Sequence, residues 1–277
     1  MFRRLIAHIR TYINRNRYFM IEVSNLVKEF PLNKKQREEM GINSSKLKVL
    51  HEVTFNCQPG RIFSLLGPNG AGKTTTLRII ATILAATSGS VKVGGVDVKE
   101  DAGKARSKMG FLTGTTGLYE RLTPDELINY FGKLNGIDSQ TLTERKNRLY
   151  DLLDMHSFAS KRIGKLSTGM KQKVSITRTM IHDPEVVVFD EPTSGLDVIT
   201  AKNIIELIKD CKTQNKTVIF SSHIMSEVDL LCDDLAIIHD GRILFNETME
   251  NFRNNMQTEN LTEEFIRIVN EAEKQTA

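Results

Sequence analysis

The sequence has few cysteines and no long apolar run. Its three cysteines are far apart and match neither a disulfide framework nor the C-x-x-C spacing of a zinc site. We therefore expect a protein of a reducing compartment. No stretch approaches the run of about 18 apolar residues that a membrane-spanning helix needs. The first residues also lack an apolar core followed by a small-residue cleavage site, so we expect neither a membrane span nor secretion.

Acidic residues are absent from residues 1–19, which carry five arginines. The net charge of the chain is +4, so residues 20–277 are close to neutral, and we expect no nucleic-acid partner. Apolar residues recur at helical spacing, which predicts a basic amphipathic N-terminal extension on an anionic membrane surface or an acidic partner. A surface helix packed on its own domain, or a domain that begins at Met20, are the alternatives. An organellar presequence is disfavoured because the segment has no serine.

The chain from Met20 onward has the pattern of an α/β protein. Alternating, β-branched residues predict strands in "IEVSNLVKEF" and "KVLHEVTFNC", separated by a solvated insertion from Pro31 to Lys48. The short apolar runs "EVVVFDEP", "TVIFSSH" and "DLAIIHDG" alternate with helical segments. This order indicates a parallel sheet with helical crossovers.

Helical patterning dominates two further regions. Thr123 as N-cap, Pro124 in the first turn and Glu126 as partner of a capping box predict a helix start, and helical patterning continues to about Ile181. The last thirty residues predict a C-terminal helix with one apolar stripe, formed by Leu261, Phe265, Ile266 and Val269. We find no internal repeat.

The segment "GPNGAGKTT" matches the phosphate-binding pattern G-x-x-x-x-G-K-[ST]. It lies between an apolar strand and a helix, where its mechanism requires it. Glycines let backbone N–H groups surround an anion, Lys73 reaches the outer phosphates, and the Thr74 hydroxyl binds Mg²⁺. The predicted ATP-binding residues are Gly67, Pro68, Asn69, Gly70, Ala71, Gly72, Lys73, Thr74 and Thr75.

A pair of carboxylates follows the buried strand of "EVVVFDEP". Asp190 is placed to bind Mg²⁺ through water, and Glu191 to polarise an attacking water. Taken alone, such a pair is more often a helix cap or a solvated turn. The phosphate-binding loop makes the metal and catalytic roles the better interpretation.

The segment "LSTGMKQKV" contains a Ser, a Thr and a Gly before a predicted helix, which can offer hydroxyls and N–H groups to an anion. It precedes "DEP" by about twenty residues and is followed by "SGLD" and "FSSH". In order and spacing these motifs resemble the ATP-binding cassette (ABC) family over about residues 20–245. Leu166, Ser167 and Gly169 match the signature LSGGQ, whereas Thr168 and Met170 replace its first Gly and its Gln.

The resemblance implies a P-loop NTPase fold with a RecA-like core, an antiparallel β subdomain and an α-helical subdomain at about 113–175. The nucleotide-binding domain would span 20–245, followed by a helical tail at 246–277. In this family the signature, here Ser167, Thr168 and Gly169, contacts the ATP of a second subunit. The segment "SGLD", Ser194, Gly195, Leu196 and Asp197, would line the dimer interface. His223 would contact the γ-phosphate and position water together with Glu191.

Two positions depart from the family pattern or are uncertain within it. Gly114 stands where the family usually carries a Gln that reaches Mg²⁺. The aromatic residue that stacks on adenine usually follows the first strand, which nominates Phe30. An ordinary strand role for Phe30 is an equal alternative, because the insertion follows it directly.

The resemblance implies an ATPase subunit of a transporter, with ATP and Mg²⁺ as ligands. It would act as a homodimer, or a heterodimer with another ABC ATPase, on a separate integral membrane permease at the cytoplasmic face of the membrane. The segment "FLTGTTGLYERLTPDELINYFGKLNGI" is similar to ABC-2 exporters, and "GLYERLTP" to the ATPases of sodium-extruding exporters. The alternatives are a regulatory cassette acting on ribosomes or DNA, and a silent paralogue. The silent form is disfavoured because Lys73, Asp190, Glu191 and His223 are all present.

Overall fold

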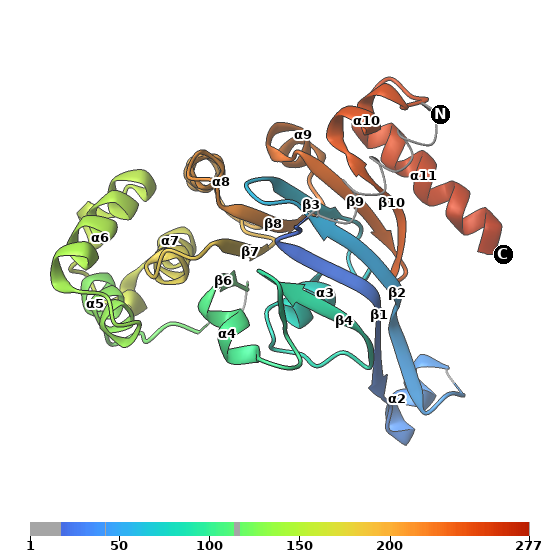
Figure 1. Ribbon diagram of the computed structural model, residues 1–277, viewed down its shortest axis with the longest axis horizontal. Coiled ribbons are helices and arrows are strands. Elements are labelled where there is room, and N and C mark those ends of the chain that lie inside the picture. The colour runs from blue at the N-terminus through green and yellow to red at the C-terminus, as the bar shows by residue number, and fades with distance from the viewer. Residues whose placement is uncertain (1–17, 42, 114–116, 277) are drawn as a thin grey trace, which may run out of the picture.

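Two β-sheets form the centre of the molecule (Figure 1). The computed structural model describes residues 18–41, 43–113 and 117–276, so Gly114 and residues 1–17 of the predicted N-terminal helix lie outside the described residues. The antiparallel sheet has the order β2-β1-β4-β5, and the larger sheet has the order β10-β9-β3-β8-β7-β6. The strands are β1 (Ile21–Pro31), β2 (Lys46–Cys57), β3 (Ile62–Leu66), β4 (Ser88–Val93), β5 (Val96–Asp97), β6 (Met109–Leu112), β7 (Val186–Asp190), β8 (Thr217–Ser222), β9 (Asp234–His239) and β10 (Arg242–Thr248).

Helices surround the larger sheet and extend from it as a separate arm. The α-helices are α2 (Lys34–Met40), α3 (Lys73–Ile80), α4 (Ala102–Ser107), α5 (Pro124–Leu134), α6 (Ser139–Leu153), α7 (Thr168–Met180), α8 (Val198–Thr213), α9 (Met225–Leu231), α10 (Met249–Asn254) and α11 (Leu261–Thr276). Two 3-10 turns, η1 (His156–Phe158) and η2 (Ile163–Lys165), precede α7. In the described residues no helix combines the length and the apolar composition that crossing a bilayer requires.

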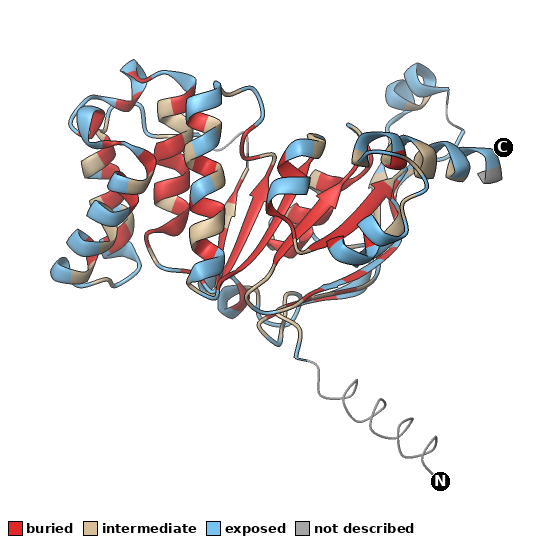
Figure 2. Cartoon of the chain, turned by 90° about the horizontal axis from the view of Figure 1, so that it is seen from above, coloured by how far each residue is buried: buried red, intermediate tan, exposed pale blue. Residues whose placement is uncertain are grey.

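The larger sheet confirms the predicted α/β class. Strands β6, β7, β8, β3 and β9 pair in parallel, and β10 closes the edge in antiparallel pairing. Strands β3, β7 and β8 are buried along their whole length, because helices or the second sheet cover both faces (Figure 2). Side chains alternate between the faces. Val186 and Val188 join the core that contains α3, whereas Val187 and Phe189 join the core with α7 and α8.

The predicted solvated insertion from Pro31 to Lys48 is wrong in part. Strand β1 runs on to Pro31, which pairs with Lys46 of β2, and the helix α2 joins the two strands. A capping box between Asn33 and Gln36 starts this helix, and Gly41 in the left-handed conformation ends it. The polar composition reflects a solvent-exposed helix on a long hairpin instead of an irregular loop.

The helical arm contains α5, α6 and α7 (Figure 1). The predicted start of α5 is confirmed: the Thr123 hydroxyl accepts from the Glu126 N–H, and the Glu126 carboxylate accepts from the Thr123 N–H. The helical patterning up to Ile181 is interrupted. Helix α6 ends where Asp154 adopts the left-handed conformation, and the 3-10 turns lead from there to α7.

The C-terminal tail forms two helices instead of the one that was predicted. Helix α10 ends at Asn254, and Asn260 starts α11 by accepting from the Glu263 N–H. Phe265 packs against the core as the predicted stripe requires, but Ile266 is 49% exposed. The residues of α11 that pack on the core are Leu261, Phe265 and Ile268, so the packed stripe differs from the predicted one.

Candidate functional site

The segment Gly67–Thr75 connects the buried strand β3 to helix α3, as its pattern predicts. Gly70 and Gly72 have φ angles of 85° and 104°, in the left-handed region that favours glycine. A side chain at Gly67 would place its Cβ 2.2 Å from the backbone oxygen of Ile238. The loop can therefore curl tightly above the sheet only with glycine at these positions.

Lys73 reaches back into this loop from the first turn of α3. Its side chain is 4% exposed, and its Nζ donates to the carbonyl oxygens of Gly67 (2.7 Å) and Pro68 (3.0 Å). The same Nζ lies 3.4 Å from Oε1 of Glu191. This buried positive charge at the start of a helix attracts phosphate groups.

Thr74 and Asp190 meet across the loop. The Thr74 Oγ1 donates to Oδ1 of Asp190 at 2.9 Å, and Asp190 is 7% exposed at the end of β7. A hydroxyl and a carboxylate are the oxygen ligands that Mg²⁺ accepts, with water and phosphate completing its shell. Within residues 18–41, 43–113 and 117–276, no three His, Cys, Asp or Glu side chains gather as a metal-binding group. The oxygen pair thus fits a small divalent cation that the nucleotide helps to bind.

Glu191 stands between two cationic or protonatable groups. Its Oε1 faces Lys73, and its Oε2 lies 3.3 Å from Nδ1 of His223. The backbone of Glu191 has a φ angle of 48°, which is uncommon for a residue with a side chain. The structure therefore brings the predicted groups Lys73, Thr74, Asp190, Glu191 and His223 to one place at the carboxyl ends of the parallel strands.

Two residues at this place were not predicted. The Ser221 hydroxyl at the end of β8 contacts Asp190 and the backbone of Glu191. The Gln172 side-chain amide of α7 donates to the carbonyl oxygen of Pro192 at 3.0 Å. Ser221 belongs to "FSSH", and the alternation of a buried strand would have placed it on the same face as Ile219, toward α3. No sequence signal separates Gln172 from other polar residues of a helix.

The signature residues lie at the start of α7. The Ser167 hydroxyl accepts from the Met170 N–H, and both Ser167 and Thr168 are exposed. Gly169 is buried, and a Cβ there would approach Oγ1 of Thr200 to 2.9 Å. In Figure 1, α7 lies well to the left of α3, which carries the phosphate-binding loop. The structure thus does not bring the signature to the loop of its own chain.

The segment from Ser194 to Asp197 connects the catalytic end of β7 with α8. Ser194, Gly195 and Asp197 are exposed, Leu196 is half-buried, and the Asp197 carboxylate caps α8 by accepting from the N–H groups of Ile199 and Thr200. These hydrogen bonds hold the pKa of Asp197 below its usual range. The segment is therefore a turn with its own hydrogen bonds, and most of its surface is free for another molecule.

Phe30 lies at the far end of the long hairpin of β1 and β2. It pairs with Leu47, and the Nζ of Lys28 stands 4.8 Å from the centre of its ring. The same hairpin runs past the phosphate-binding loop, because Leu50 would contact a side chain at Gly72. Phe30 is half-buried, which leaves part of its ring accessible.

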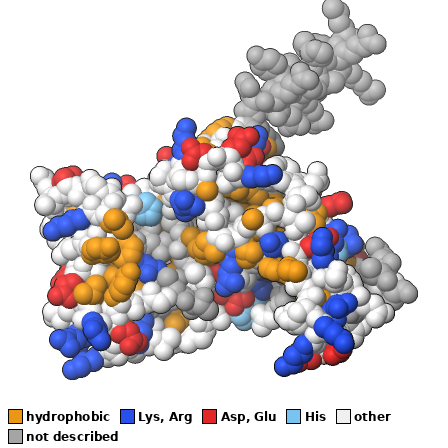
Figure 3. Space-filling model, turned by 90° about the horizontal axis from the view of Figure 1, so that it is seen from below, with side chains coloured by type: hydrophobic (Ala, Val, Ile, Leu, Met, Phe, Trp, Pro, Cys, Tyr) orange, Lys and Arg blue, Asp and Glu red, His pale blue; other side chains and the backbone are white. Residues whose placement is uncertain are grey.

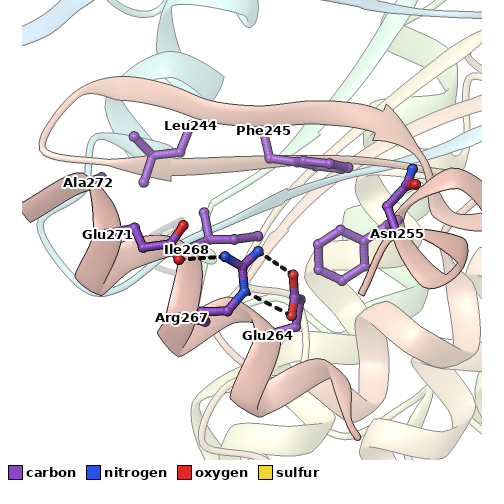
Figure 4. A pocket seen from close by; sticks show the side chains of 9 residues that line it. Leu244, Phe245, Asn255, Glu264, Arg267, Ile268, Glu271 and Ala272 are labelled. Atoms are coloured by element: carbon purple, nitrogen blue, oxygen red, sulfur yellow. Dashed lines mark hydrogen bonds and ion pairs between the residues drawn. The ribbon is translucent and has the colours of Figure 1, made fainter. Parts of the chain in front are cut away.

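A separate cleft of about 340 Å³ lies between β10, α10 and α11, away from the loop (Figure 4). Arg267 projects into it and is paired with Glu264 at 2.6 Å and with Glu271 at 2.7 Å. Glu264 also accepts from the Gln257 N–H and the Thr258 hydroxyl. These charges satisfy one another and hold α11 to the segment that precedes it.

Comparison with known proteins identifies the family. A family model described as "ABC transporter" matches residues 50–194. The ABC transporter ATP-binding protein NatA of Bacillus subtilis is 38% identical over 221 residues, which cover 79% of this chain and 90% of NatA. The linearmycin resistance ATP-binding protein LnrL of the same organism is 33% identical over 209 residues, covering 76% of this chain and 67% of LnrL.

A solved structure of the ATP binding subunit of an ABC transporter has the same fold. It superimposes with a TM-score of 0.78 at 25% identity and covers 90% of this chain and 99% of the other. The match confirms the predicted P-loop NTPase fold. With the loop, the carboxylates and the family match on the same residues, the chain belongs to the ABC transporter family and is an ATP-binding, ATP-hydrolysing subunit of such a transporter.

Proposed function

We propose that two copies of the chain, or one copy and a related ATPase, enclose ATP between them and that hydrolysis powers export through a separate permease. One observation carries the proposal. Lys73, Thr74, Asp190, Glu191 and His223 converge on the loop, whereas the signature helix α7 presents its hydroxyls elsewhere. The site of one chain lacks the anion-binding groups that the signature of another chain can supply.

The residues of the site have different proposed roles toward ATP. Lys73 and the N–H groups of the curled loop bind the phosphates. Thr74 and Asp190 would hold Mg²⁺, which neutralises phosphate charge. Glu191 and His223, 3.3 Å apart, are placed to orient the attacking water and to accept its proton. The half-buried Phe30 is proposed to stack on adenine.

The surface beside Ser194–Asp197 supports the proposed dimer. Val198 and Ile199 follow this segment and are 86% and 73% exposed. Large apolar side chains that lie together and exposed next to a functional segment are typical of an interface. A second copy that places its loop against this surface would cover them.

The helical arm supports a membrane partner. Tyr130 and Leu134 of α5 are 54% and 66% exposed. Figure 3 shows hydrophobic side chains gathered on the left of the face seen from below, over the end of the molecule that holds α5 and α6. We propose that this arm docks on the permease, which would hold the subunit at the cytoplasmic face of the membrane.

We propose Na⁺ as the exported cargo. The proposal rests on the similarity of "GLYERLTP" to the ATPases of sodium-extruding exporters, and NatA as a relative is consistent with it. Purification of the chain from detergent-solubilised cells should recover an integral membrane protein, whereas ribosomes or DNA would favour the regulatory alternative. A deletion strain should grow poorly in high sodium, and normal growth there would remove Na⁺ as cargo.

Dimerisation of the Glu191→Gln variant tests the shared site directly. Because this variant should bind ATP without consuming it, ATP should convert it from monomer to dimer, measured by light scattering during gel filtration. The matched control is Lys73→Ala in the same background, which should stay monomeric with ATP. A Glu191→Gln protein that binds ATP and remains a monomer would contradict the proposal.

A further inference from the structure

Ser221 lies at the end of β8 and is completely buried. Its hydroxyl donates to Oδ1 of Asp190 at 2.9 Å and accepts from the backbone N–H of Glu191 at 3.0 Å. One hydroxyl thus contacts both acidic residues that follow β7. The hydroxyl contacts Asp190 at its side chain and Glu191 at its backbone.

The sheet places Ser221 in this position. Strands β7 and β8 are parallel neighbours, and Asp190 pairs with Ser221 in their register. Side-chain alternation turns both residues to the face that carries α3, where Thr74 arrives from the other side.

The direction of each hydrogen bond follows from the chemistry of the groups. A hydroxyl has one proton, and the Glu191 N–H can only donate, so the Ser221 proton goes to Asp190. Oδ1 of Asp190 therefore accepts two hydrogen bonds, one from the Thr74 hydroxyl and one from the Ser221 hydroxyl. Thr74 is also the hydroxyl proposed to bind Mg²⁺. Ser221 is then the donor to Asp190 that metal binding leaves in place.

The contact with Glu191 holds an uncommon backbone conformation. Glu191 has a φ of 48°, which persists only where the surroundings fix it. Ser221 fixes the N–H on one side of this residue, and Gln172 fixes the carbonyl of Pro192 on the other. The carboxylate between Lys73 and His223 depends on this conformation.

We propose that Ser221 is a positioning residue for ATP hydrolysis, which holds the Asp190 carboxylate and the Glu191 backbone in their working geometry. This inference rests on the roles proposed above for Asp190 and Glu191. Ser221 itself does not reach the reacting atoms. Ser221 therefore acts through the two acidic residues. Its loss should change the Mg²⁺ dependence of nucleotide binding through Asp190 and the turnover of ATP through Glu191.

Three substitutions at Ser221 and one matched control test the proposal. Ser221→Ala and Ser221→Val remove the hydroxyl, whereas Ser221→Thr keeps it with nearly the shape of Val. The control is Ser64→Ala on the adjacent strand β3, because Ser64 is equally buried and its hydroxyl has no hydrogen-bond partner within the described part of the chain. The Thr and Val pair keeps the test valid if the alanine variant folds poorly.

Turnover is the first measurement. Loss of a hydrogen bond to a charged group should lower kcat of Ser221→Ala by about 10- to 100-fold, with KM for ATP changed by less than about 3-fold. The kcat of Ser221→Thr should exceed the kcat of Ser221→Val by about the same factor by which wild-type kcat exceeds that of Ser221→Ala. Ser64→Ala should keep wild-type kcat. Equal losses in Ser221→Ala and Ser64→Ala, or equal kcat in the Thr and Val variants, would overturn the proposal.

Mg²⁺-dependent nucleotide binding is the second measurement, made on Glu191→Gln proteins that do not turn over. Adding Ser221→Ala should raise the Mg²⁺ concentration needed for half-maximal ATP binding by about 3-fold or more, while ATP binding in EDTA stays unchanged. An unchanged Mg²⁺ midpoint would remove the Asp190 part of the proposal. The turnover of Glu191→Gln without further substitution tests the role proposed for Glu191, so a failure of that role is distinguishable from a failure of the proposal for Ser221.

Discussion

The Lys73 ammonium is almost enclosed, and oxygens of Gly67, Pro68 and Glu191 surround it. Lys73→Ala removes the only charge of the loop segment Gly67–Thr75. We expect loss of detectable nucleotide binding, measured by fluorescence of a labelled ATP analogue. Because the variant also loses the hydrogen bonds from Nζ to the carbonyl oxygens of Gly67 and Pro68, circular dichroism checks that it is folded. Binding at wild-type affinity would contradict this role.

Glu191→Gln tests the catalytic carboxylate. The amide keeps the size of the side chain but is a poor proton acceptor, so ATP binding should persist while turnover falls by about two to three orders of magnitude. Each factor of ten corresponds to about 1.4 kcal/mol of transition-state stabilisation. Phosphate release under saturating ATP measures the effect. Near-normal turnover would remove Glu191 from its role.

The sequence predicts which residues belong to the site where a local motif marks them. It does not predict residues that only the fold brings to the site. The loop and the two carboxylates follow from local patterns whose chemistry is known. Ser221 acquires its contact only from the pairing of β7 with β8, and Gln172 from the packing of α7 near Pro192. The local sequence does not predict which distant segments pair.

At the scale of elements, α5 has a start that its sequence fully specifies. Thr123→Ala removes one half of the capping box and should lower the free energy of unfolding by about 1 kcal/mol, measured by urea denaturation. Thr143→Ala is the matched control. Its hydroxyl donates to the Ser139 carbonyl within α6 and leaves no helix end unpaired when removed, so a change of less than about 0.5 kcal/mol is expected. Equal losses in both variants would contradict the capping explanation.

Helix starts were more predictable than helix ends and interruptions. Helix α5 carries Thr, Pro and Glu at defined offsets, which act within one turn. Helix α6 stops at Asp154, a residue that seldom marks a helix end, and the tail breaks between α10 and α11 without glycine or proline. The sequence predicted a solvated insertion at residues 31–48 but not the helix α2 within it, because charged residues suit an exposed helix as well as a loop.

At the scale of the whole molecule, the reactivity of the three cysteine thiols shows whether the core is intact. Cys57, Cys211 and Cys232 are buried, and burial raises the pKa of each thiol, to about 12 for Cys211 and Cys232. The native protein should not react with a thiol reagent at pH 8, whereas all three thiols should react in denaturant. Rapid labelling of the native protein would show that the core opens.

The same thiols predict an alkaline limit of stability. A raised folded-state pKa gives stability that is fully present below the unfolded pKa, ordinarily 9.0, and is lost as pH rises toward about 12. The urea midpoint should therefore fall between pH 9 and pH 11. Cys211→Ala should fall less steeply than wild type over this range. An identical slope in both proteins would assign the loss to other groups.

Unreactive native thiols allow a clean test of the pairing between chains. Asn69 in the loop and Ser167 in the signature are both exposed, so Asn69→Cys and Ser167→Cys supply two reactive thiols. In the Glu191→Gln background with ATP, mixing the two variants, each with one added cysteine, should give a crosslinked dimer. A doubly substituted chain that crosslinks only within itself would contradict the shared site.

The turn between β9 and β10 has one more consequence. Gly241 donates its N–H to the carbonyl of Ala71 in the loop and accepts from the His51 N–H of β2, and a Cβ there would stand 2.1 Å from the oxygen of Val49. His239, just before this turn, is paired with Glu273 of α11. A displacement of α11 would therefore reach the phosphate-binding loop through this ion pair, two residues of chain and one backbone hydrogen bond, so a ligand bound to α11 is expected to change ATP binding from a distance.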